Sequence, residues 1–149
     1  MVETNKKREK EFPFGYFKSI LEYNPETGIL IRKYKNGDTK GERFFNTRFA
    51  GKAAGSKKSD GYLEITVDYE RFFLHRVAYL LMIGEWPNKQ IDHINGIKDD
   101  NRWENLRAVS NNENRKNQKI DKRNSSGKTG VYWNKRLNKW RVQISVNKK

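Results

Sequence analysis

The sequence predicts an α+β protein with a small N-terminal β-meander and a core helix, a strand–loop–strand–helix unit, and a C-terminal β-hairpin. Apolar residues make up only 34% of the chain and charged residues another 34%, which limits the core to a small volume. Short runs of strand composition alternate with Gly, Pro, Asn and Asp turns, as expected of antiparallel sheets. One run, His75 to Ile83, is apolar on nearly every side and predicts a buried helix.

The N-terminal part is predicted from its charge pattern and its turn residues. Residues 1–15 alternate basic and acidic side chains with little to bury, so we expect a flexible charged arm. A β-rich part over residues 16–88 begins with a hairpin between Phe17 and Lys33, whose turn Asn24–Gly28 contains Pro and Gly. Residues 34–48 are polar and basic without clear periodicity, and they predict a loop or an insertion.

Further strands and the core helix complete this part. Residues 62–67 have strand composition after the turn Asp60-Gly61, and residues 72–74 follow a second turn as another strand. The helix from His75 to Ile83 ends at Gly84, a residue that tolerates the positive φ of a helix C-terminus. We expect a meander of short strands packed against this helix.

The charge of the chain indicates a polyanionic partner. There are 32 Lys and Arg against 18 Asp and Glu, a formal net charge of +14, and such a field concentrates polyanions around a protein. The excess is uneven, since residues 120–149 hold nine basic side chains and one acidic side chain. Nucleic acid is the expected partner, and a basic surface kept for solubility is the alternative.

The residue types that are missing exclude several classes of chemistry. The chain has no cysteine, so disulfides, thiolate zinc sites and cysteine nucleophiles are excluded, and any metal must take oxygen or imidazole ligands. No apolar run approaches the roughly 20 residues that span a bilayer. The charged stretch Met1–Lys10 also lacks the apolar core of a signal peptide. We therefore expect a soluble cytoplasmic protein without a membrane partner.

The segment 89–119 contains the residues that suggest chemistry. A short strand ends in Asp92-His93, a polar loop follows, and a second strand runs from Asn105 to Val109. Ser110 is suited to cap a helix that begins at the next residue. A hairpin packed on that helix would bring Asp92 and His93 to face Asn114.

The pattern DHINGIKDDNRWENL, followed by NNEN, resembles the HNH endonuclease family, in particular its homing-type branch. The upstream pieces NPETG, DGY, LHRVAYL and GEWP resemble the N-terminal part of that family, so the resemblance covers roughly residues 17–119. It implies a ββα-metal fold and a metal-dependent endonuclease, of homing or phage type, that hydrolyses phosphodiester bonds in double-stranded DNA. The alternative is a non-catalytic DNA-binding protein on the same scaffold, and a monomer and a homodimer both remain open.

The resemblance also implies roles for individual residues. His93 is the first motif histidine and the general base, and Asn105, 12 residues later, supports catalysis by joining the two halves of the hairpin. Asp92 and Asn114 hold one divalent ion, Mg²⁺ or Mn²⁺. The chemistry agrees with these roles, because an imidazole with its ordinary pKa of about 6.5 accepts a proton near neutral pH, and hard divalent cations prefer oxygen ligands.

Several basic and aromatic side chains are candidates for DNA contact, because Arg binds phosphate oxygens in a bidentate manner. In contrast, we expect a structural role for His75, and we expect Asp99 and Asp100 to be loop acids that hold no metal. The candidates are Arg76, Arg102, Arg107, Arg115, Lys116, Trp133, Arg136, Trp140 and Arg141.

The C-terminal segment follows a polar linker, residues 120–129, and predicts a basic β-hairpin over residues 130–149. Its run VYWNKRLNKWRVQISV resembles the start of the ethylene-response-factor type of DNA-binding domain, without that family's third strand and helix. An isolated two-stranded hairpin is only marginally stable in water. Trp133 and Trp140 are therefore expected either to contact DNA or to pack against the body of the protein.

Overall fold

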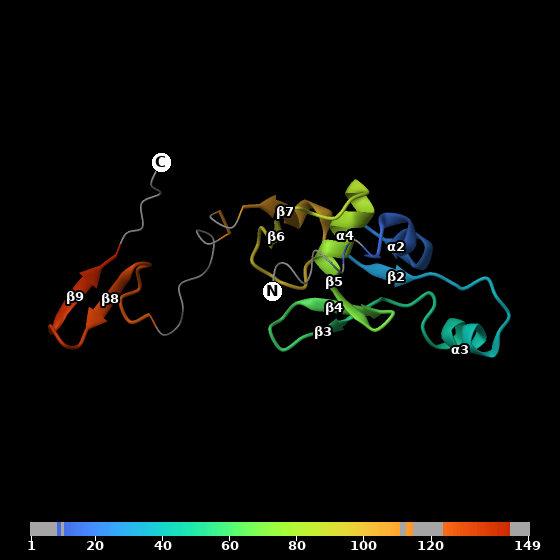
Figure 1. Cartoon of the computed structure of the whole chain (residues 1–149), viewed down its shortest axis with the longest axis horizontal. Helices are drawn as coiled ribbons and strands as arrows, with labels where there is room; N and C mark the ends of the chain where they lie inside the picture. The colour runs from blue at the N-terminus through green and yellow to red at the C-terminus, as the bar shows by residue number, and fades with distance from the viewer. Residues whose placement is uncertain (1–8, 10, 111–112, 115–123, 144–149) are drawn as a thin grey trace. The chain divides into compact units, whose positions relative to one another are not determined.

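The computed structural model describes residues 9, 11–110, 113–114 and 124–143. The chain divides into two compact units, Met1–Asn112 and Glu113–Lys149, and each is described by itself. The mixture of short helices and small sheets confirms the predicted α+β class (Figure 1). The elements in chain order are α2 (Phe14–Ile20), β1 (Leu21–Tyr23), β2 (Leu30–Arg32), α3 (Lys40–Arg48), β3 (Ser56–Lys57), β4 (Leu63–Val67), β5 (Glu70–Phe73), α4 (Leu74–Ile83), β6 (Gln90–His93), the 3₁₀ turn η1 (Trp103–Asn105), β7 (Leu106–Val109), β8 (Val131–Asn134) and β9 (Lys139–Val142).

Small antiparallel sheets make up the β part of the first unit. β1 pairs with β2, β4 lies between β3 and β5, and β6 pairs with β7. The predicted hairpin and meander are therefore present, although the strands of the hairpin occupy only residues 21–23 and 30–32. A bridge between Ile31 and Ala53 connects β2 to the chain that leads into β3.

The core helix α4 agrees with the prediction from its apolar run. Leu74, Val77 and Leu80 are at most 2% exposed, and the helix packs against α2, β4 and β5. It ends at Gly84, whose φ of 90° is the left-handed conformation that glycine adopts without strain. Within the described residues, no helix is long and apolar enough to cross a membrane.

Helix α2 includes the end of the stretch predicted as a flexible arm, residues 1–15. α2 begins at Phe14, within that stretch, and it carries Phe17, which is completely buried. The ring of Phe17 contacts those of Phe72 and Trp86, at centroid distances of 5.1 and 5.4 Å. The charge alternation concealed this packing, because the aromatic partners lie far along the chain and leave no local periodicity.

Helix α3 occupies most of the segment predicted as a loop over residues 34–48. The Thr39 hydroxyl accepts a hydrogen bond from the Glu42 backbone N–H, and the Glu42 carboxylate accepts one from the Thr39 N–H, which forms a capping box. None of the nine helical residues, all of them described, is buried. The prediction relied on apolar periodicity, whereas the signal present here is the Thr-x-x-Glu spacing.

The second unit contains the predicted C-terminal hairpin. β8 and β9 pair antiparallel, and Trp133 lies directly opposite Trp140, with ring centroids 5.2 Å apart in an edge-to-face arrangement. The turn includes Asn138 at a φ of 48°, a conformation that asparagine tolerates. At the start of the same unit, Glu113 and Asn114 are helical, and the other residues of the helix predicted from residue 111 to 119 lie outside the described residues.

Candidate active site

The β6–β7 hairpin positions the first two candidate residues. In the register of this pair Asp92 lies opposite Arg107 and His93 lies opposite Leu106. Successive residues of a strand point to opposite faces, so Asp92 and His93 cannot share one face of the sheet. His93 is 5% exposed, whereas Asp92 is partly exposed.

His93 is held in a cluster of polar and aromatic side chains. Its Nε2 lies 3.0 Å from Asn101 Oδ1, and its ring centroid lies 5.9 Å from that of Tyr62 and 5.2 Å from that of His75. If Nε2–H of a neutral His93 donates to this carbonyl oxygen, the lone pair lies on Nδ1. The contact with Asn101 thus holds the ring in one orientation.

The second histidine, His75, is a neutral member of this cluster. Burial lowers the pKa of His75 to about 3, with smaller contributions from His93 and Arg76. Its Nδ1 is buried and has no hydrogen-bond partner among the described residues. At 6% exposure the ring packs in the interior and is uncharged at neutral pH.

Asn105 closes the loop between the two strands. Its Oδ1 accepts from the backbone N–H of Asn95 at 2.9 Å, and its Nδ2 donates to the carbonyl of Asp100 at 2.7 Å. The backbone carbonyl of Asn105 also accepts from Ile94 N–H. One buried side chain therefore joins the start of the loop to its end.

The two acidic residues of the loop, Asp99 and Asp100, form ion pairs with basic side chains. Hydrogen bonds from Arg102 hold the pKa of Asp100 well below its usual range, and Arg102 also binds Glu104 at 2.9 Å. Asp99 binds Lys57 at 2.6 Å, and that hydrogen bond lowers the pKa of the Asp99 carboxyl. Asp99 and Asp100 thus each form an ion pair with a basic side chain, and the expectation that they hold no metal stays a prediction.

Asp92 supplies the hard oxygen that a divalent cation would need. Its Oδ2 accepts from Nη2 and Nε of Arg107 at 2.7 and 3.2 Å. Among the described residues, no three His, Asp or Glu side chains gather as a metal site. Mg²⁺ usually keeps several waters and takes few protein ligands, so a single carboxylate such as that of Asp92 fits its preference for oxygen. Asn114, the other expected ligand, belongs to the second unit.

The structure changes the interpretation of one candidate for DNA contact. Arg76 donates to both carboxylate oxygens of Glu9 at 2.6 and 2.8 Å and to the carbonyls of Pro87 and Lys89, and its side chain is 16% exposed. The guanidinium is therefore held in a buried ion pair, which favours a structural role, and the DNA contact expected of Arg76 stays an untested prediction. The ion pair was not predictable locally, because its two partners are 67 residues apart.

The remaining candidates for DNA contact fall into three groups. Arg102 and Arg107 form ion pairs with loop and strand carboxylates but keep 43% and 40% of their side-chain surface exposed. Arg115 and Lys116 lie outside the described residues. The last group, Trp133, Arg136, Trp140 and Arg141, lies on the C-terminal hairpin, and all four side chains are exposed.

The first hairpin holds the loop that carries Asn101. The Tyr23 hydroxyl donates to the Asn101 carbonyl at 2.7 Å, and Trp103 N–H donates to the carbonyl of Pro25 at 2.9 Å. Gly28, at a φ of 73°, lies directly against the backbone of Asn101 and Arg102. We call this set of contacts the hairpin clamp. Asn101 itself is 1% exposed, and the sequence analysis missed it because it is one of several similar asparagines in the loop.

Substitution of Gly28 by alanine is expected to strain this clamp. A Cβ at Gly28 would lie 2.5 Å from the carbonyl carbon of Asn101, at a φ that disfavours side chains. We expect the free energy of unfolding to fall by about 2–3 kcal/mol in chemical denaturation. The control is Gly15→Ala in α2, where a Cβ meets nothing within 4 Å and a gain of about 0.5–1 kcal/mol is expected. Equal free energies of unfolding for the two variants would contradict the close contact of Gly28 with the backbone of the loop.

Comparison with known proteins shows a similarity over part of the chain. A solved structure described as "DNA binding and cleavage by the HNH homing endonuclease I-HmuI" aligns with 66% of this chain at 25% identity, with a TM-score of 0.44. The chain spans 51% of the length of that protein. The comparison with curated proteins gave no match. The ethylene-response-factor resemblance of residues 130–149 has no support from any comparison.

The family comparison concerns the segment that contains both histidines. Residues 72–116 match the model of the HNH endonuclease family. The match includes α4, the β6–β7 hairpin, its loop and Asn114. This segment of the chain is thus similar to the HNH endonuclease family.

Proposed function

We propose that the protein is a metal-dependent DNA endonuclease of the homing or phage type with His93 as its general base. The observation that carries the proposal is the buried hydrogen bond between His93 Nε2 and Asn101 Oδ1, inside the segment that matches the HNH family. It supports the role because a base must be held in one orientation and one tautomer before it removes a proton. A non-catalytic DNA-binding protein would not need this arrangement.

The proposed reaction is hydrolysis of a phosphodiester bond. An imidazole nitrogen of His93 takes a proton from a water molecule, and the water oxygen attacks the phosphorus. The bond to the 3′ oxygen breaks, a solvent water protonates that oxygen, and the products are a 5′ phosphate and a 3′ hydroxyl. Since His93 is only 5% exposed, bulk water has little access to the ring. The base would therefore act on a water held beside the ring, and Asn105 would maintain the loop in which this happens.

Asp92 and Asn114 are the proposed ligands of one divalent ion, Mg²⁺ or Mn²⁺. Such an ion, when bound, would neutralise charge on the scissile phosphate and on the leaving oxygen. Arg107 contacts the Asp92 carboxylate at 2.7 Å, so this guanidinium lies next to the proposed ligand.

The proposed substrate is double-stranded DNA. The net charge of +14 favours association with phosphates, and the exposed basic side chains of the β8–β9 hairpin add a separate candidate surface. The solved neighbour is an HNH homing endonuclease by its title, which agrees with this substrate for the proposed enzyme.

Incubation of the full-length protein with supercoiled plasmid tests the proposal. With Mg²⁺ we expect nicked or linear DNA, and with EDTA we expect none, while a gel shift persists in both conditions. Restoring excess Mg²⁺ to the EDTA sample should restore cutting, which controls for damage to the protein. DNA binding without cleavage in Mg²⁺ and in Mn²⁺ would favour the non-catalytic alternative.

A further inference from the structure

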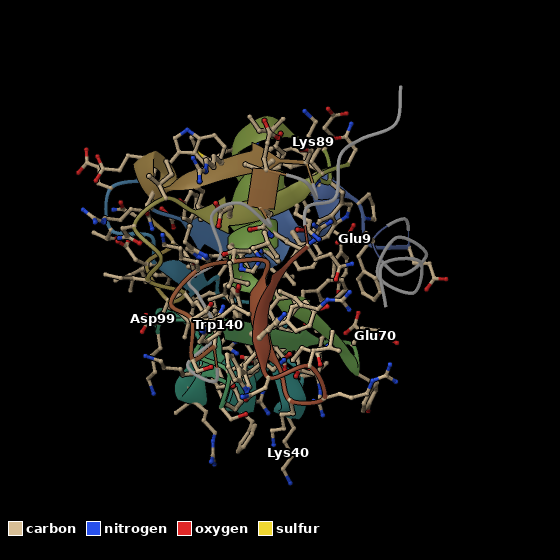
Figure 2. All side chains as sticks on the ribbon, turned by 90° about the vertical axis from the view of Figure 1, so that its left-hand side faces the viewer. Glu9, Lys40, Glu70, Lys89, Asp99 and Trp140 are labelled. Carbon is tan, nitrogen blue, oxygen red and sulfur yellow. The ribbon has the colours of Figure 1, made fainter. Side chains whose placement is uncertain are left out.

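Helix α3 and its flanks form an exposed surface that the proposed active site does not use. In Figure 1, α3 stands apart from α2 and α4, joined to β2 and β3 by extended segments. Figure 2 shows the side chain of Lys40, the first helical residue, at the outer edge of the molecule. A nine-residue helix is marginal on its own, and this one, whose residues are all described, buries none of them in the core. Its contribution to folding is therefore small.

The surface combines aromatic rings with cations. Phe44 is 60% exposed, and the Arg48 guanidinium lies 5.7 Å from the ring centroids of both Phe44 and Phe49. Arg32 lies 5.6 Å from the Phe49 ring, and Lys35 lies 4.8 Å from the Phe45 ring. Stacking on a ring orients an arginine while its N–H groups remain able to bind an anion.

The charge of this surface is strongly one-sided. Residues 32–52 contain seven Lys and Arg against two acids. Asp38 pairs with Arg43 at 2.9 Å, and Glu42 is bound to Thr39 in the capping box. The acids thus have local partners, and the surface as a whole presents excess positive charge to an anionic partner.

We propose that Lys40, Arg48 and the rings beneath Arg48 form a binding surface for the phosphate backbone of duplex DNA, distinct from the cleavage site. The occupant follows from charge complementarity, and its identity as DNA rests on the proposed function. We call it the α3 surface. None of its residues belongs to the loop 94–105, so it would hold the substrate without taking part in the reaction.

Binding of the full-length protein to a labelled DNA duplex in EDTA tests the α3 surface without cleavage. The variant is Lys40→Gln/Arg48→Gln, because glutamine keeps helix propensity and removes both charges. We expect Kd to rise about tenfold. The logarithm of the association constant should also depend less steeply on the logarithm of the salt concentration, with a slope about 2 smaller in magnitude. The matched control is Lys18→Gln on α2, where the ammonium also lies over a ring, that of Phe14, and where Kd should stay within about twofold.

Each alternative outcome has a defined meaning. The proposal for the α3 surface is overturned if the double variant is folded by circular dichroism and its Kd and salt slope are unchanged. An equal loss in Lys18→Gln also overturns it, since general charge would then be the cause. A larger effect on an RNA duplex than on DNA overturns the assignment to DNA. Cleavage by the wild-type protein is measured separately with Mg²⁺. If the wild type does not cut DNA but the double variant still binds DNA more weakly, the proposed nuclease function is contradicted and the α3 surface is not.

Discussion

Replacement of His93 by alanine is expected to lower the rate of DNA cleavage by a factor of roughly 10²–10⁴, the usual contribution of a general base. DNA affinity should change little, because the ring is 5% exposed and contacts protein groups. The measurement is single-turnover cleavage of a saturated DNA duplex with Mg²⁺, beside a Kd determined in EDTA. A variant that cuts as fast as the wild type would remove His93 from the mechanism.

The second histidine supplies a matched control for this experiment. His75 lies 5.2 Å from His93 between ring centroids, is buried to a similar degree and is neutral. His75→Phe keeps a ring in the same cluster and removes both ring nitrogens, of which Nδ1 is buried and has no hydrogen-bond partner among the described residues. We expect cleavage close to that of the wild type. Equal losses in the two variants would indicate damage to the cluster rather than loss of a base.

The largest effect on stability is expected for Phe17→Ala. Phe17 is completely buried and contacts the rings of Phe12, Phe72 and Trp86. Removal of its ring therefore leaves a cavity where α2 packs against the meander. We expect the free energy of unfolding to fall by about 3–5 kcal/mol, measured by denaturant titration followed by circular dichroism.

The control for this prediction is a second phenylalanine on a short helix. Phe44 on α3 is 60% exposed, and Phe44→Ala should change the free energy of unfolding by at most about 0.5 kcal/mol. A small loss for Phe17→Ala, or a loss of the same size for Phe44→Ala, would contradict the placement of the core between α2, β5 and α4.

The elements that could be predicted are those with local signals. Residues adjacent along the chain determine helix α4 with its final Gly84 and the turns of the β1–β2 and β8–β9 hairpins. α2 could not be recognised, because its aromatic side chains gain their burial from distant rings. α3 has a local signal, Thr39 and Glu42, but no apolar periodicity to draw attention to it.

The candidate site shows the same division. Asp92, His93 and Asn105 could be identified because they lie in one continuous motif. Asn101 and the partner of Arg76 could not, since these contacts depend on Tyr23, 78 residues from Asn101, and on Glu9. The metal role of Asp92 and Asn114 and the DNA contacts of the C-terminal hairpin stay predictions.

The hairpin clamp determines how much of the chain must be transferred to place this segment in another protein. The family match begins at residue 72, yet Tyr23, Pro25 and Gly28 support the loop that holds His93. A graft of residues 72–116 into another scaffold would transfer the proposed reactive groups without the contacts that support their loop. A functional chimera would therefore have to carry the chain from β1 onward, so the smallest transplantable unit is larger than the matched segment.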